Sequence, residues 1–170
     1  MTKVAVIIGS LSRKSIHRHI ANQIMQFAPA DIEVEEVKID DLPIYTQDYD
    51  ETNVPAYDRV RAQLKQADAV LIVTPEHNRT IPAATKNIID IASRPYGQSI
   101  WTNKKVAIVS SSPSAYGGIV VGLELRKIFV FLGSDIMKRE MYVSNGSLEL
   151  SPHTTEFLKN FANDFYQWAK

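Results

Sequence analysis

The chain has no cysteine among its 170 residues. This absence excludes disulfide bonds, thiolate nucleophiles and any zinc or iron–sulfur site built on cysteine ligands. It suits a reducing compartment, so we expect a cytoplasmic protein. The apolar run near the start, Val4–Ile8, is far too short for a signal peptide or a membrane span, and we expect no membrane association.

An excess of charge of one sign is also missing, since 19 lysines and arginines balance 19 aspartates and glutamates. Nucleic-acid binding needs clustered cations to neutralise phosphates, so we expect no nucleic-acid partner. The dinucleotide fingerprint G-x-G-x-x-G, the Walker A loop, the G-x-S-x-G elbow and the zinc motif His-Glu-x-x-His are absent as well. The four histidines show no metal-ligand spacing, and we expect no metal site.

What is present is an alternation of strand and helix patterns. Apolar or alternating runs predict strands at residues 4–8, 34–39, 69–74, 104–110 and 136–143. Helical spacing predicts helices at 15–27, 56–66, 83–92, 119–133 and 152–170, with the apolar run 128–132 in the core. The pattern indicates an α/β fold: one flavodoxin-like domain, residues 1–170, with a doubly wound five-stranded parallel sheet in the order 2-1-3-4-5 and helices on both faces.

A serine-rich loop, Gly9-Ser10-Leu11-Ser12-Arg13-Lys14-Ser15, follows the first predicted strand. The unpaired N–H groups and the dipole at the start of the next helix favour an anion there, most often a phosphate. The hydroxyls of Ser10, Ser12 and Ser15 add donors, and the Arg13 guanidinium can hold two phosphate oxygens. The alternative is an ordinary turn in which Ser15 only caps the helix.

A second polar loop, Thr74–Pro82, follows the third strand and is stiffened by two prolines. Its backbone amides could hydrogen-bond a flat heterocycle at little ordering cost, and His77 could stack on the ring. The alternative is a plain connection with a solvent-exposed histidine. Residues 40–55, with two prolines and no periodicity, predict a long loop.

The third loop runs from Ser110 to Gly118 after the fourth strand. Gly117 and Gly118 permit a close approach of the backbone, and Tyr116 could cover a ring face, although a flexible connection is the alternative. Because the three loops follow parallel strands, we expect them at one edge of the sheet, where open α/β sheets bind ligands. A phosphate pocket and a ring platform without an acid–base pair are typical of an enzyme whose cofactor carries the chemistry.

From Lys3 to about Val143 the sequence resembles the NAD(P)H-dependent FMN reductases, a family that includes quinone-, chromate- and azo-reducing flavoproteins. The motifs that carry the resemblance are Gly9-Ser10-Leu11-x-x-x-Ser15, Thr74-Pro75-Glu76-x-Asn78-x-x-x-Pro82, Lys86-Asn87-x-x-Asp90 and Ser112…Gly117-Gly118. The resemblance implies non-covalent FMN, NADPH or NADH as cosubstrate, and a flavin, quinone, azo compound or metal oxyanion as electron acceptor. It also implies a homodimer or homotetramer.

The resemblance assigns parts of the cofactor to the three loops. It implies phosphate binding by Ser10, Arg13 and Ser15, a ring wall made by Pro75, Glu76, His77 and Asn78, and contacts along the ring and ribityl chain from Ser112, Gly117 and Gly118. It also implies that residues 45–57 belong to a subunit contact. Two residues depart from the family pattern, which commonly has arginine at position 12 and tyrosine at position 77.

A rival interpretation from another functional class is a flavodoxin-type electron carrier, which binds FMN without its own NAD(P)H activity. Such carriers are usually strongly acidic and use a Thr-Gly-Asn-Thr-like phosphate loop, whereas this chain is neutral and lacks that loop. A doubly wound domain that binds another phosphate ligand is a third interpretation. We therefore expect an FMN-dependent NAD(P)H oxidoreductase in which the flavin, and no side chain, carries the reaction.

Overall fold

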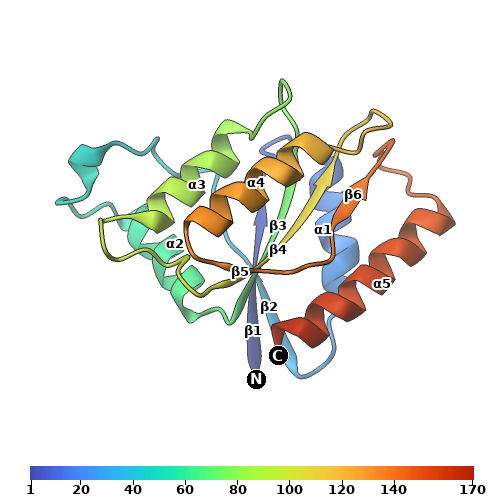
Figure 1. Cartoon of the computed structure of the whole chain (residues 1–170), viewed down its shortest axis with the longest axis horizontal. Coiled ribbons are helices and arrows are strands. Elements are labelled where there is room, and N and C mark those ends of the chain that lie inside the picture. The colour runs from blue at the N-terminus through green and yellow to red at the C-terminus, as the bar shows by residue number, and fades with distance from the viewer.

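A computed structural model describes all residues, 1–170, and has a parallel sheet at its centre (Figure 1). The elements along the chain are β1 (Thr2–Ile8), α1 (Ile16–Gln26), β2 (Ile32–Glu36), the 3-10 helix η1 (Gln47–Tyr49), α2 (Pro55–Gln66), β3 (Ala69–Pro75), α3 (Ala83–Ser93), β4 (Lys105–Ser111), α4 (Ile119–Phe131), β5 (Asp135–Ile136), β6 (Met141–Val143) and α5 (Pro152–Ala169). All strand pairs are parallel. Their order, β2-β1-β3-β4-β5, confirms the predicted flavodoxin-like sheet.

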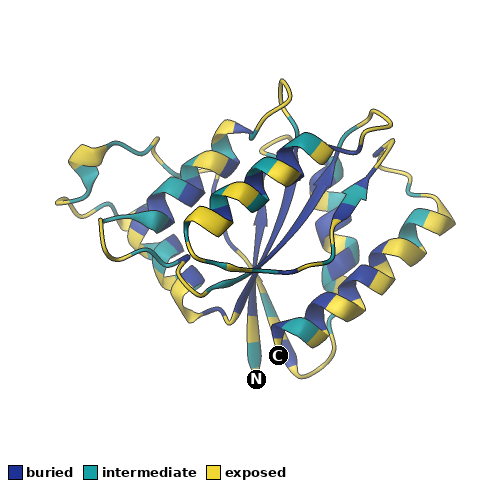
Figure 2. Ribbon diagram, viewed as in Figure 1, coloured by how far each residue is buried: buried dark blue, intermediate teal, exposed yellow.

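Helices cover both faces of this sheet (Figure 1). Helices α1 and α5 pack on one face, and α2, α3 and α4 pack on the other. Strand β3 lies in the middle and all seven of its residues are buried, as its unbroken apolar pattern predicts. Both faces of the sheet are covered, and its central strands β3 and β4 are almost entirely buried (Figure 2), so the ends of the strands are where the sheet can meet a ligand.

The single fifth strand predicted at 136–143 is wrong, because the structure divides it into β5 and β6. Both segments pair with β4, and four residues separate them. The backbone N–H of Met137 still donates to Val106, but its carbonyl accepts from the Arg126 guanidinium at 2.9 Å. Arg126 also pairs with Glu140 at 3.5 Å. A side chain of α4 therefore occupies the backbone carbonyl at which the hydrogen-bond ladder between the strands would continue.

The prediction that residues 128–132 lie in the core is wrong for two of the five residues. Phe129 is fully buried, whereas Val130 and Phe131 are 68% and 87% exposed. Together with Ile119 and Leu123, they form an apolar stripe on the outside of the helix, which we name the α4 outer face. None of the helices is both long enough and apolar enough to cross a membrane.

The predicted long loop before α2 is confirmed, apart from η1, and it packs against α3. The side chain of Asn87 accepts from the N–H of Tyr45 at 2.8 Å and donates to the carbonyl of Pro43 at 2.9 Å. Farther along, Asp50 pairs with the Arg94 guanidinium and accepts from the Tyr45 hydroxyl. These contacts within the chain neither use nor test a subunit contact of residues 45–57, which stays a prediction.

Candidate functional site

The three predicted loops lie side by side at the carboxyl edge of the sheet. Ile8 is in register with Val73, and Thr74 is in register with Ser110, so β1, β3 and β4 end at nearly the same level. The first residue of the first loop, Gly9, still donates to the carbonyl of Val73 at 2.8 Å. The strand register therefore brings the first, second and third loops to one edge.

Gly9 allows the first loop to leave the sheet in contact with β3 and α3. A Cβ at this position would lie 2.2 Å from the Thr85 hydroxyl oxygen and 2.7 Å from that of Thr74. These two threonine hydroxyls are fully buried and hydrogen-bonded to each other at 2.9 Å. A side chain at Gly9 would thus separate the hydrogen-bonded pair of Thr74 and Thr85 on which the first loop rests.

The first loop presents a group of unpaired backbone donors. Ser15 is the N-cap of α1, and its hydroxyl oxygen accepts from the N–H of Arg18 at 3.0 Å. This is the capping role that the sequence offered as the alternative to phosphate binding. The hydroxyl oxygens of Ser10 and Ser12 accept from N–H groups two residues ahead, which curls the loop and leaves their own O–H groups free to donate. Backbone N–H groups that donate to no atom of the chain belong to Ser10, Leu11, Arg13, Ser15, Ile16 and His17. Such a concentration of donors at a helix N-terminus suits an anion.

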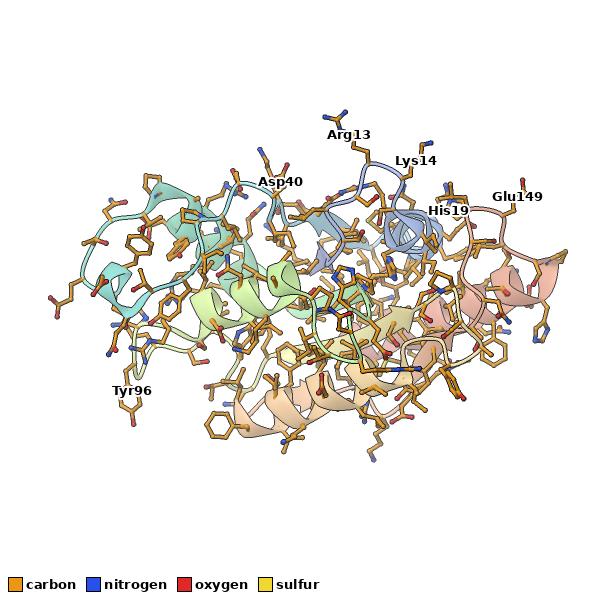
Figure 3. The ribbon with its side chains drawn as sticks, turned by 90° about the horizontal axis from the view of Figure 1, so that it is seen from above. Arg13, Lys14, His19, Asp40, Tyr96 and Glu149 are labelled. Atoms are coloured by element: carbon orange, nitrogen blue, oxygen red, sulfur yellow. The ribbon has the colours of Figure 1, made fainter.

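Arg13 stands apart from these donors. Its guanidinium forms neither an ion pair nor a hydrogen bond with the chain, and Figure 3 shows it projecting outward from the crest of the loop, beside Lys14. Arg13 therefore adds positive charge near the first loop, and the structure does not place it over the backbone donors.

A tight turn forms the tip of the second loop. His77 and Thr80 exchange backbone hydrogen bonds of 3.1 and 2.9 Å, while Asn78 and Arg79 between them have φ values of 50° and 64°. Two consecutive left-handed residues define a type I′ turn, a strained conformation for arginine. Backbone of this kind persists where its surroundings hold it, and it is concentrated at functional sites.

Glu76 holds the second loop onto α4. Its side chain is only 8% exposed and pairs with Arg79 at 3.3 Å, and its second carboxylate oxygen accepts from the N–H of Val121 at 3.2 Å. The N-cap of α4 is Gly118, which has no side chain for capping, so Glu76 supplies the anionic cap that the helix dipole favours. Its carboxylate is thus engaged by α4, and its backbone N–H donates to no atom of the chain.

The third loop is held by contacts with β4 on one side and with the second loop on the other. Gly117 and Gly118 have φ values of 60° and 74°, which only glycine adopts without strain, and the Ser110 hydroxyl donates to the carbonyl of Gly117. Tyr116 is exposed, and its ring lies 5.2 Å from the guanidinium carbon of Arg79. This cation–π contact joins the tips of the second and third loops.

A fourth loop, residues 144–147 after β6, also joins this edge, and the sequence prediction missed it. The N–H groups of Asn145 and Gly146 donate to carbonyls of the third loop at 2.9 Å. A Cβ at Gly146 would lie 2.2 Å from the Ser111 hydroxyl oxygen, so the two loops are in close contact. The Asn-Gly pair directly after a strand pattern was the available signal.

His17 is a second feature that the sequence prediction missed. The side chain is 6% exposed, and its Nε2 lies 3.1 Å from the carbonyl oxygen of Ser111 at the end of β4. Burial lowers the pKa of His17, against the opposing effect of this carbonyl, and His77 lowers it further. The ring is therefore neutral at pH 7, with Nε2 protonated to donate to Ser111. Its spacing with the buried Ile20 and Ile24 was the signal that His17 faces inward.

The burial of His17 predicts a loss of stability on acidification. Its pKa in the folded chain lies below the ordinary value of 6.5, so the unfolded chain binds the proton more readily. The contribution is fully present above pH 6.5 and is lost as the pH falls from there through the folded-state pKa. We expect urea unfolding of His17→Gln, which keeps an N–H donor, to show a shallower acid decline than the wild type. His19→Gln, on the same helix, should keep the wild-type slope, and equal slopes for all three proteins would contradict this reading.

Comparison with known proteins identifies the family of this chain. Residues 2–147 match the family model of the NADPH-dependent FMN reductases. The chain is 41% identical to a quinone reductase of Pseudomonas putida, over 98% of this chain and 94% of that one. It is 36% identical to a 2-hydroxy-1,4-benzoquinone reductase of a Burkholderia species, over 99% and 96%. The structure of FerB, a flavoenzyme NAD(P)H:(acceptor) oxidoreductase from Paracoccus denitrificans, superposes with a TM-score of 0.89 and 31% identity, covering 99% of this chain and 97% of that one. The chain therefore belongs to the NADPH-dependent FMN reductase family and is an oxidoreductase that uses FMN and NAD(P)H.

Proposed function

We propose that this chain is a quinone reductase that holds FMN across its first, second and third loops. The observation that carries the proposal is the set of unpaired backbone donors at the start of α1, which fits the phosphate of FMN. FMN held there would supply the redox chemistry, which is the transfer of two electrons from NAD(P)H to the acceptor. The names of the two curated relatives support a quinone as that acceptor.

The first loop would bind the phosphate end of FMN. The free O–H groups of Ser10 and Ser12 and the backbone N–H groups of the loop would donate to phosphate oxygens. Ser15 would act by fixing the first turn of α1 so that its free N–H groups converge on the phosphate. Arg13 would add positive charge to the surroundings of this site.

The second and third loops would form the two walls of the ring site. Pro75, Glu76, His77 and Asn78 make up the wall on the side of β3, and Ser112, Tyr116, Gly117 and Gly118 make up the wall on the side of β4. The contacts of Glu76 with α4 and of Arg79 with Tyr116 hold these walls before any ligand arrives, which lowers the ordering cost of binding. These residues bind and orient the ring, and none is required as an acid or base.

Steady-state oxidation of NADPH tests this function. Purified protein loaded with FMN should oxidise NADPH rapidly when a benzoquinone is added, and the rate should depend on both the flavin and the quinone. FMN-loaded protein whose flavin neither NADPH nor NADH reduces would support a flavodoxin-type electron carrier instead. Protein that takes up no FMN would point to another phosphate ligand.

A homodimer or homotetramer, in the reducing cytoplasm, belongs to the same proposal. The α4 outer face supports self-association, because exposed residues as large as Leu123 and Phe131 gain by being covered. We expect light scattering to give a multiple of 19.1 kDa for the wild type and the monomer mass for Leu123→Glu/Phe131→Glu. Phe157→Glu, an exposed apolar site on α5, is the matched control, and a monomeric wild type would contradict the proposal.

A further inference from the structure

The imidazole of His17 joins the start of α1 to the base of the third loop. The backbone N–H of His17 is one of the free donors in the first turn of α1, whereas its side chain turns inward and is buried. There Nε2 donates to the carbonyl oxygen of Ser111 at 3.1 Å. Since Ser111 is the last residue of β4, the third loop leaves the sheet at the residue that His17 holds. One residue therefore belongs to the phosphate end of the proposed FMN site and supports its ring end.

The residue that accepts from His17 is itself fixed in place. The Ser111 hydroxyl donates to the carbonyl of Val143 in β6 at 3.0 Å. A Cβ at Gly118 would lie 3.3 Å from the Ser111 carbonyl oxygen, and a Cβ at Gly146 would lie 2.2 Å from its hydroxyl oxygen, so the third and fourth loops both pack closely on Ser111. The hydrogen bond from His17 thus ends on a tightly packed part of the ring site.

No other side chain in the first turn of α1 hydrogen-bonds to the third loop. The hydroxyl oxygen of Ser15 accepts from the N–H of Arg18 within the turn, and the Arg18 guanidinium is directed to Glu36 at the end of β2. Without the His17 contact, the start of α1 would be held relative to the third loop only by the packing of the helix on the sheet and by the backbone of the first loop.

The separation of the two ends of the site matters because FMN carries its ring and its phosphate on one ribityl chain. Once the ring is bound, the phosphate binds at an effective concentration that depends on how well the two ends of the site match the length of that chain. A separation fixed in advance also lowers the ordering cost of binding. Riboflavin has the ring and the ribityl chain without the phosphate, so its affinity does not depend on this match.

We propose that His17 is a positioning residue that holds the phosphate end and the ring end of the FMN site at the separation that FMN requires. The inference rests on the proposed function and adds to it a side chain that acts through Ser111. Loss of the His17 hydrogen bond should weaken FMN binding about tenfold and change riboflavin binding by less than about twofold. A histidine that served only the core would lower both affinities together, or neither.

Fluorescence titration of the FMN-free protein with FMN and with riboflavin tests this role. His17→Phe keeps a ring of similar size without the N–H donor, and we expect the selective loss of FMN affinity in this variant. His17→Gln keeps an N–H donor and should recover most of that affinity. His19→Phe, on the same helix at a residue that is not buried, is the control and should bind both flavins as the wild type does.

A second variant, His17→Leu, also lacks the N–H donor but has a smaller side chain, and it should separate the two affinities in the same way. Circular dichroism and urea unfolding show whether each variant is folded. Equal losses for FMN and riboflavin, or an unchanged affinity for FMN, would overturn the inference. Failure of the proposed phosphate site has a different signature, because the wild type itself would then bind FMN no more tightly than riboflavin.

Discussion

Ser12→Asp is expected to weaken FMN binding about a hundredfold and to leave riboflavin binding nearly unchanged. Ser12 lies in the middle of the first loop, between residues whose backbone N–H groups are free. A carboxylate there would face the FMN phosphate, and at about 5 Å with an effective dielectric constant of about 20 the repulsion is about 3 kcal/mol. Such a penalty corresponds to about a hundredfold in the dissociation constant.

The substitution at Ser12 should not disturb the fold. Ser12 is exposed, and its hydroxyl oxygen only accepts a long hydrogen bond from the N–H of Lys14. An aspartate or asparagine oxygen can accept the same bond. Ser12→Asn is therefore the matched control, and fluorescence titration should show that it binds FMN nearly as the wild type does. If Ser12→Asp bound FMN as tightly as Ser12→Asn, the phosphate would have to lie elsewhere.

Gly9→Ala should lower the free energy of unfolding by about 3 kcal/mol. The new methyl group would lie 2.2 Å from one buried threonine oxygen and 2.7 Å from another, and neither threonine has space to retreat. Overpacking a core typically costs 1–3 kcal/mol, and separating the hydrogen bond between Thr74 and Thr85 adds to that cost. Urea unfolding followed by circular dichroism measures the loss.

A double-mutant cycle with Thr85→Ala shows whether the loss at Gly9 comes from this clash. Removing the Thr85 hydroxyl makes room for the methyl group, and the Thr74 hydroxyl keeps a partner in the carbonyl of Pro75. We expect the double variant to be more stable than additivity predicts by at least about 1 kcal/mol. A Gly9→Ala protein within about 0.5 kcal/mol of the wild type would contradict the packing described beneath the first loop.

The sheet could be predicted because its signals are local. Apolar runs such as Val70–Val73 mark buried strands, and the alternation with helical spacing fixes the parallel order. The division of the last strand could not be predicted, since it depends on Arg126 reaching the Met137 carbonyl from another element. The exposure of Phe131 was missed for a related reason. An apolar residue in the sequence indicates a surface that gains by being covered. It does not indicate whether this chain or another molecule covers that surface.

The position of the candidate site could be predicted from the sequence, whereas most of the contacts within it could not. Parallel strands end at one edge, so the convergence of the three loops follows from the order of the strands. That the Glu76 carboxylate caps α4 depends on Gly118 lacking a side chain and on a contact between residues 45 positions apart. The contact between His17 and Ser111 spans 94 positions, and no local pattern reports such a pairing.

The most direct test of the central claim is an anaerobic reduction of the FMN-loaded protein followed by reoxidation. One equivalent of NADPH should bleach the visible absorption of the bound flavin, and one equivalent of 1,4-benzoquinone should then restore it with formation of the hydroquinone. This result would establish that FMN bound to this protein passes two electrons from the nicotinamide to a quinone. Flavin absorption that persists with NADPH and with NADH, or reduced flavin that the quinone does not reoxidise, would contradict the account.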